Sequence, residues 1–267
     1  QTHQPVLKAD GLAAGKGVFL PTSYKDTTET LEKMFEQYDR ILIESRVTGR
    51  EMSLFVVCDG SSCVFMPPAG DYKRRYDLDQ GPNTGGMGAI APYYLVSPTW
   101  LQTHVYPQIR RLVRGEKYRG FLYVGLMIDT TVSSSPVWNV LEFNCRLGDP
   151  ETQAVLSLYQ NPSIIPSPVT STTPNTPLPT SIPTTHPAEQ SLLPPENPSF
   201  YRLLYQSSNG TLSSLPSPVW DRKNIACNVV VTNYGYPTSK TDLTRVVFPP
   251  LPPHIRRYSA NLNSPLS

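Results

Sequence analysis

The stretch VLEFNCRLGDPE carries three polar side chains whose types and spacing suit phosphate chemistry. Because the side chains of a β-strand alternate between its two faces, Glu142, Asn144 and Arg146 are predicted to share one face, with Leu141 and Phe143 packed on the other. Carboxylate and amide oxygens suit Mg²⁺, and a guanidinium can hold a carboxylate or phosphate through two hydrogen bonds. The pattern predicts a metal and phosphate site, and a half-exposed edge strand with ordinary polar residues is the alternative.

The stretch GPNTGGMGA holds four glycines within nine residues and follows the charged run GDYKRRYDLD. Glycine permits backbone conformations that are closed to other residues, so successive N–H groups can form a concave anion site. The upstream run places Asp71 and Lys73 just before this loop. The combination indicates a substrate with both amino and phosphate groups, while a solvated surface loop is the alternative.

Near the start of the chain, KADGLAAGKG resembles a phosphate-binding P-loop but departs from its spacing. Three residues, not four, separate Gly11 from Gly15, and Gly17 stands where a P-loop has Ser or Thr. The following VFLP favours a strand, whereas a P-loop needs a helix whose N-terminus faces the phosphates. We therefore expect a glycine flap between two antiparallel strands, with Lys8 on the first strand and Lys16 in the loop.

The stretch LIESRVTGRE ends one predicted strand and precedes another. Such a connection can present backbone groups to an adenine edge, with Glu44 and Glu51 on either side of a nucleoside. Exposed loop carboxylates without a ligand are the alternative.

The elements that must position these groups form an α/β (α+β) pattern. Amphipathic helices are predicted over 27–39, where Leu31, Met34, Phe35 and Tyr38 have helical spacing, and over 98–115, with Ser97 as its N-cap. Short apolar runs bounded by turn residues predict the strands, which are expected at 5–10, 17–21, 40–45, 52–60, 62–68, 123–129 and 137–144.

Composition divides the chain into an ordered domain over 1–156, a Pro/Ser/Thr-rich insert over 157–199, a partial C-terminal subdomain over 200–247 and an irregular tail over 248–267. Between Asn161 and Phe200 there are 11 Pro and 13 Ser/Thr, with no Lys or Arg. So few apolar residues cannot offset the entropy of ordering the chain, which predicts disorder there. Asn224 to Pro237 is expected to be a strand that ends in a Gly-Tyr-Pro turn.

The overall composition excludes several classes of protein. A net charge of +2 gives no field for nucleic acid or an anionic membrane surface, and no apolar run approaches the roughly 20 residues of a membrane span. The four cysteines lack paired metal spacing, which favours a reducing compartment, and we expect a cytosolic protein. Because the chain starts without Met and enters a strand almost at once, we expect a fragment.

Taken in chain order, these stretches resemble the ATP-grasp superfamily, and within it the phosphoribosylamine–glycine ligase family. The residues that carry the resemblance are KADGLAAGKGV, GPNTGGMGA, GFLYVGLMID and LEFNCRLGDPETQ, so it covers 5–156; it continues from residue 200 in LPSPVW and VVVTNYGYP. The resemblance implies an ATP-grasp fold, in which two α+β subdomains clasp ATP. The small flap subdomain would span about 5–55 and the larger metal-site subdomain about 56–156.

The resemblance also implies a reaction, in which ATP, glycine and 5-phosphoribosylamine give ADP, phosphate and glycinamide ribonucleotide through a glycyl phosphate. It implies Mg²⁺ or Mn²⁺ at Glu142 and Asn144, and catalytic roles for Lys8 and Arg146. The implied nucleotide-binding residues are Lys8, Gly11, Gly15, Lys16, Gly17, Glu44, Val47 and Glu51. The implied substrate-binding residues are Asp71, Lys73, Asn83, Thr84, Gly85, Gly148 and Asp149.

Two departures from the family pattern leave alternatives open. Ser45 and Arg46 follow Glu44 where the hinge commonly has a second acidic residue, and the family's N-terminal domain is not in the chain. The chain is therefore expected to be a part of the ligase. In the full-length protein, this part could be fused to other purine-pathway domains. The alternatives are a truncated ATP-binding remnant without full activity, or an ATP-grasp ligase for another carboxylate.

Overall fold

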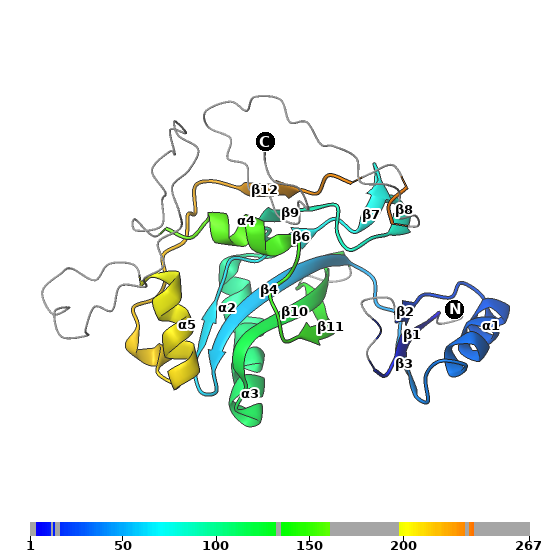
Figure 1. Ribbon diagram of the computed structural model, residues 1–267, viewed down its shortest axis with the longest axis horizontal. Helices are drawn as coiled ribbons and strands as arrows, with labels where there is room; N and C mark the ends of the chain where they lie inside the picture. Colours follow the sequence, from blue (N-terminus) through cyan, green and yellow to red (C-terminus); the bar gives the residue numbers. More distant parts are fainter. Residues whose placement is uncertain are drawn as a thin grey trace, which may run out of the picture. The chain divides into compact units, whose positions relative to one another are not determined.

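Figure 1 shows a computed structural model of the chain, which describes residues 4–11, 13, 17–131, 135–160, 198–232 and 235–237. The chain divides into two compact units, Gln1–Val231 and Thr232–Ser267. The elements below all belong to the first unit. Most of the predicted insert and the whole predicted tail lie outside the described residues.

The first three strands form a small antiparallel sheet in the order β2-β1-β3, accompanied by helix α1. The Ser23 hydroxyl accepts a hydrogen bond from the Asp26 amide at 3.1 Å, so the helix begins before the predicted start at residue 27. Met34 is buried as predicted, but Phe35 is 59% exposed, so its predicted packing is wrong. The elements are β1 (Pro5–Ala9), β2 (Val18–Phe19), α1 (Tyr24–Phe35) and β3 (Ile41–Ser45).

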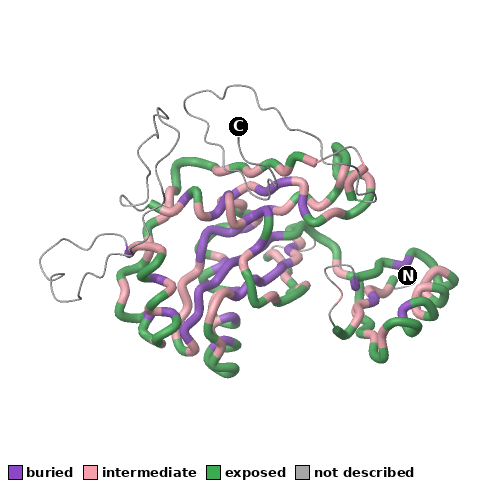
Figure 2. Tube along the Cα trace, viewed as in Figure 1, coloured by how far each residue is buried: buried purple, intermediate pink, exposed green. Residues whose placement is uncertain are grey.

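A four-stranded antiparallel sheet in the order β11-β10-β4-β5 forms the centre of the unit. Both faces of its middle strands are covered, which explains why β4 is one long apolar run in place of an alternating one. Figure 2 shows buried residues running along these strands. The strands are β4 (Arg50–Asp59), β5 (Cys63–Phe65), β10 (Arg119–Asp129) and β11 (Val137–Asn144).

Helices α2 (Pro98–His104) and α3 (Tyr106–Glu116) cover one face of this sheet. Their apolar residues Leu101, Ile109 and Val113 pack with the even-numbered residues of β4 and β10. A single helix is predicted over 98–115, but the structure breaks it at Val105. Pro107 explains the break, because proline has no amide hydrogen and is tolerated only in the first turn of a helix.

The other face is covered by a second small sheet, in the order β12-β9-β6, and by helices α4 and α5. Phe55, Val57 and Tyr123 of the central sheet pack there with Val155 of α4 and Leu203 of α5. Residues 198–231 thus share a core with the earlier strands, while the predicted division into domains stays a prediction. The elements are β6 (Gly70–Asp71), β7 (Arg74–Tyr76), β8 (Gln80–Asn83), β9 (Gly88–Ala91), α4 (Glu151–Ser157), α5 (Phe200–Asn209), a 3₁₀ turn (Leu212–Ser214) and β12 (Ala226–Val229).

Strand β12 is shorter than the strand predicted from Asn224 onward, although residues 235–237 do form the predicted turn. No helix in the described ranges has the length and hydropathy that crossing a membrane would require.

Candidate functional site

Lys8 connects the small sheet to the edge strand of the central sheet. Its Nζ lies 2.7 Å from Glu44 Oε2 on β3 and donates a hydrogen bond to the backbone oxygen of Leu141 on β11, at 2.8 Å. Lys8 and Glu44 lie on the same face of the small sheet, because Lys8 is opposite Leu42 and Glu44 is opposite Val6. Lys8, which is predicted to bind phosphate, therefore contacts both the carboxylate of the predicted adenine hinge and the strand that carries the predicted metal ligands.

The glycine-rich loop joins two antiparallel strands, as predicted. Lys8 is opposite Val18, and the Ala9 amide donates to the Gly17 oxygen at 2.8 Å. Gly11 has a φ of +153°, which favours glycine. Two predicted flap residues, Gly15 and Lys16, lie outside the described residues. The strand that follows the loop excludes a P-loop.

The connection between β3 and β4 depends on a glycine. Gly49 has a φ of +144°, and a Cβ there would lie 2.5 Å from the Ile128 backbone oxygen. Val47 in the same connection is half-buried. The two carboxylates that flank the connection have separate cationic partners, because Glu44 pairs with Lys8 and Glu51 pairs with Lys73.

The predicted metal ligands share one face of β11. Glu142 is opposite Gly125 and Asn144 is opposite Tyr123, and Asn144 Nδ2 donates to Glu142 Oε1 at 2.9 Å. The packing predicted for Phe143 is wrong: the side chain is 47% exposed, because β11 is the edge strand of its sheet. Leu141 is half-buried.

Arg146 lies past the end of β11 and still reaches the predicted site. Its guanidinium carbon is 5.9 Å from the ring centroid of Tyr123, the residue directly opposite Asn144. In the described part of the chain, no three His, Cys, Asp or Glu side chains form a metal-binding group. One carboxylate and one amide fit Mg²⁺, which keeps several waters and is commonly held together with substrate phosphates.

Behind these groups, Ser53 and Tyr123, which the sequence did not single out, lie with Glu151, which the sequence predicts as an additional acceptor in this neighbourhood. Ser53 Oγ is 2.9 Å from the Tyr123 hydroxyl and donates to Glu151 Oε1 at 3.2 Å. Glu151 is only 3% exposed. For Ser53 the available signal is that it interrupts the apolar run of β4, which marks a polar requirement in a strand that is otherwise core.

The Lys73 ammonium lies 2.6 Å from Glu51 Oε2. Burial alone lowers the pKa of Lys73, but the charge and the hydrogen bond of Glu51 outweigh burial and raise it above its ordinary value. Lys73 therefore stays charged, and its pairing with Glu51 joins a predicted substrate residue to a predicted nucleotide residue.

The loop GPNTGGMGA uses several of its amides within the protein. The Thr84 amide donates to the Lys73 oxygen at 2.8 Å, the Gly86 amide to Thr84 Oγ1 at 3.0 Å, and the Met87 amide to the Tyr72 oxygen at 2.7 Å. The prediction that successive free amides form an anion site is therefore wrong for these three groups. Substrate roles for Asn83, Thr84 and Gly85 stay predictions.

Gly86 brings three substrate-side segments together. Its φ is +120°, and a Cβ there would lie 2.3 Å from Pro150 Cδ and 3.0 Å from Asp71 Oδ1. Pro150 follows Gly148 and Asp149, and Asp149 Oδ1 accepts a hydrogen bond from Gln153 Nε2 at 2.9 Å. Only a residue without a side chain allows this approach, so the glycine loop, Asp71 and the turn before α4 form one neighbourhood.

Comparison with known proteins identifies the family. Residues 1–152 match the family described as phosphoribosylglycinamide synthetase, ATP-grasp (A) domain. The chain belongs to this family. The match confirms the resemblance seen in the sequence, and the observed mixture of antiparallel sheets and helices is the ATP-grasp fold.

Named relatives of this ATP-grasp domain agree with the assignment. A phosphoribosylamine–glycine ligase of Leptospira interrogans is 35% identical over 243 residues, which cover 87% of this chain and 47% of the relative. The bifunctional purine biosynthetic protein ADE1 of Schizosaccharomyces pombe is 42% identical over 166 residues, 60% of this chain and 21% of the relative. The crystal structure of a phosphoribosylamine–glycine ligase from Thermotoga maritima has a TM-score of 0.64 at 29% identity, covering 89% of this chain and 51% of that one. The chain thus spans about half the length of such ligases.

Asp71 gives the ATP-grasp domain a testable dependence on pH. Its Oδ1 is buried without a hydrogen-bond partner among the described residues. Burial, together with the charges of Glu151 and Glu51, raises the pKa of Asp71 from 3.8 to about 7, and the charge of Lys73 partly opposes this rise. The pKa of Asp71 is higher in the folded protein than in the unfolded chain, so the protonated carboxyl favours the folded state. This contribution to stability is fully present below about pH 4 and is lost as the pH rises through about 7.

We therefore expect Asp71→Asn to have a higher melting temperature than wild type at pH 8 and a smaller difference at pH 5. Thermal unfolding of both proteins at the two pH values measures this. Asp149→Asn, at an exposed position, is the control and should change neither value. A wild type that is more stable than Asp71→Asn at pH 8 would contradict the assigned protonation.

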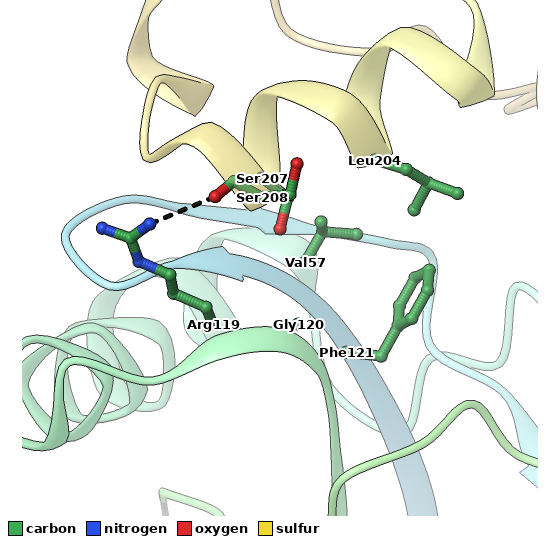
Figure 3. Close-up of a pocket in the computed structure, with 7 residues that line it drawn as sticks. All are labelled: Val57, Arg119, Gly120, Phe121, Leu204, Ser207 and Ser208. Atoms are coloured by element: carbon green, nitrogen blue, oxygen red, sulfur yellow. Dashed lines mark hydrogen bonds between the residues drawn. The ribbon is translucent and has the colours of Figure 1, made fainter.

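A hollow outside this neighbourhood lies between α5 and the strands β4 and β10 (Figure 3). Its Arg119 donates to the Ser208 oxygen at 3.1 Å, and its Ser207 hydroxyl donates to the Cys58 oxygen at 2.7 Å. The arginine thus caps the Ser208 carbonyl near the end of α5, which is a structural role. None of the predicted site residues lines this hollow.

Proposed function

We propose that the chain is the ATP-binding part of a phosphoribosylamine–glycine ligase. The observation that carries the proposal is the position of Lys8, which contacts both Glu44 and the backbone of Leu141 next to Glu142. This contact holds a cation on the strand that precedes the glycine flap, next to the strand that carries the proposed metal ligands. Such an arrangement suits the binding of a triphosphate.

The nucleotide side of the proposed site combines several segments. Lys8 binds ATP phosphates, the flap from Gly11 to Gly17 closes over them, and the backbone around Glu44 and Val47 holds the adenine. Glu51 contacts the ribose while sharing its carboxylate with Lys73. Glu142 and Asn144 would hold Mg²⁺ or Mn²⁺, which would offset the negative charge of the phosphoryl group.

The proposed reaction has two steps that need no side-chain nucleophile. A glycine carboxylate oxygen attacks the γ-phosphorus of ATP, the bond to ADP breaks, and glycyl phosphate forms. The amine nitrogen of 5-phosphoribosylamine then attacks the acyl carbon, phosphate leaves, and the nitrogen loses a proton to give the amide. Arg146 offsets charge on the transferring phosphoryl or acyl-phosphate oxygens, and the neighbourhood of Asp71, Lys73 and Gly148 orients the substrates.

A second candidate is an ATP-binding protein without full ligase activity. Measuring Mg-ATP binding and ADP release separately, with a panel of amino acids and other carboxylates, distinguishes the candidates. Glycine-dependent ADP release in the presence of 5-phosphoribosylamine supports the ligase. Binding without turnover supports the second candidate, and turnover with another acid but not with glycine contradicts the proposed substrate.

We also propose that the protein is cytosolic and acts on small molecules in purine synthesis. The bifunctional purine biosynthetic relative supports a possible fusion to other domains of the pathway.

A further inference from the structure

Cys58 and Cys63 lie directly opposite each other in the hairpin of β4 and β5. The neighbouring Asp59 amide donates to the Ser62 oxygen at 3.2 Å, so the alternation of an antiparallel ladder makes the cysteine pair a non-hydrogen-bonded one. The Cα atoms of such pairs lie about 4.5 Å apart, within the range that a disulfide spans. Both thiols are free in the structure.

The surroundings of the two thiols differ in a way that suits stepwise oxidation. Cys58 is fully buried in the apolar cluster between the central sheet and α3, whereas Cys63 is partly exposed. Arg114 Nε donates to the Ser61 oxygen at 2.9 Å, and the Arg110 guanidinium carbon is 5.0 Å from the ring centroid of Phe65. These contacts hold two cations beside the hairpin.

The thiolate forms more readily at Cys63. A hydrogen bond from Cys58 lowers the pKa of Cys63 and, together with Arg110 and Arg114, outweighs burial and the charge of Asp59. The same hydrogen bond and burial raise the pKa of Cys58. Cys63 is thus the thiol that an oxidant reaches and that reacts as a thiolate, and Cys58 is the thiol positioned to follow it.

We propose that Cys58 and Cys63 are a modification site that forms a reversible disulfide with a small disulfide oxidant such as glutathione disulfide. The Cys63 thiolate attacks one oxidant sulfur, the oxidant S–S bond breaks, and one glutathione leaves. Cys58 then loses its proton and attacks Cys63 Sγ, which releases the second glutathione. The two cysteines lose two electrons, the oxidant gains them, and the two thiol protons end on the two glutathione molecules.

This site is separate from the proposed nucleotide site. Glu51 and Ser53 lie near the start of β4, whereas Cys58 lies near its end. The inference therefore stands or falls independently of the proposed ligase function.

The test treats the reduced, folded chain with glutathione disulfide, alkylates the remaining thiols in denaturant and maps the peptides by mass spectrometry. We expect a Cys58–Cys63 disulfide that dithiothreitol reverses, while the exposed Cys145 and Cys227 carry glutathione or the alkyl group. Alkylated Cys58 and Cys63 under conditions that glutathionylate Cys145 and Cys227 would overturn the proposal.

Two variants make the test sharper. The double variant Cys145→Ser, Cys227→Ser retains only the pair, and oxidation should reduce its titratable thiols from two to none. Cys58→Ala should stop at a glutathione adduct on Cys63. An oxidised double variant that keeps both thiols would overturn the proposal even if Cys58→Ala failed to fold.

Discussion

Glu142→Ala is expected to reduce metal-dependent ATP turnover by on the order of 10²-fold or more while leaving the fold intact. Removing one preorganised group that stabilises transition-state charge costs about 10²–10³-fold in rate, and a metal ligand acts on the same charge. The fold should persist because Glu142 is exposed on the edge strand β11, where it accepts a hydrogen bond from Asn144.

Steady-state ADP release at several Mg²⁺ concentrations measures this effect, and thermal unfolding shows whether the fold is retained. Glu116→Ala removes an exposed carboxylate from the end of α3 and is the matched control, with turnover expected to stay at the wild-type rate. Turnover by Glu142→Ala at the wild-type rate would show that the metal assignment is wrong. If the wild-type chain binds ATP without turnover, the Mg²⁺ dependence of ATP affinity is the corresponding measurement.

Lys8→Met is expected to raise the dissociation constant for ATP by roughly 10- to 100-fold. A hydrogen bond to a charged group contributes about 1.5–3 kcal/mol, and each 1.4 kcal/mol is a factor of ten in affinity. The Lys8 side chain is 20% exposed and is already held by Glu44 and by the Leu141 oxygen, so the ammonium is positioned before ATP arrives. Methionine keeps most of the packing and removes the charge.

Isothermal titration of each variant with Mg-ATP measures this difference. Lys25→Met on α1 removes an equally charged side chain that is 87% exposed, and should leave ATP affinity unchanged. Lys16→Met tests the lysine that a P-loop would use, and should have a smaller effect than Lys8→Met. A larger loss of affinity in Lys16→Met than in Lys8→Met would contradict the assignment of Lys8.

Several features of the site follow from local sequence patterns alone. The alternation of a strand predicts that Glu142 and Asn144 share a face, and the structure confirms it with a direct hydrogen bond. The residues after Gly17 predict a strand in place of a helix, which excludes a P-loop. Both predictions succeed because strand geometry over a few residues depends on neighbours in the chain and not on distant partners.

Local patterns fail where the partner is remote in sequence or where two patterns compete. Apolar spacing predicts one helix over 98–115, but Pro107 interrupts it within an otherwise continuous apolar face. The glycines near Gly85 predict a set of free amides. The amides of Thr84 and Met87 instead donate to backbone oxygens just before β7, and the Gly86 amide donates to a hydroxyl within the loop. The glycine content of a loop shows how freely its backbone can turn, but not which hydrogen-bond acceptors lie close to its amides.

The sequence by itself determined the family, the strand that carries Glu142 and Asn144, and the flap that begins after Lys8, because each depends on residue types at short spacing. Only the tertiary structure placed Lys8 against Leu141, 133 residues away in the chain, and paired Lys73 with Glu51. It also placed Glu151 behind Ser53, and Cys58 opposite Cys63 across a specific register. Such contacts follow from strand register and from the packing of distant elements, which no local pattern encodes.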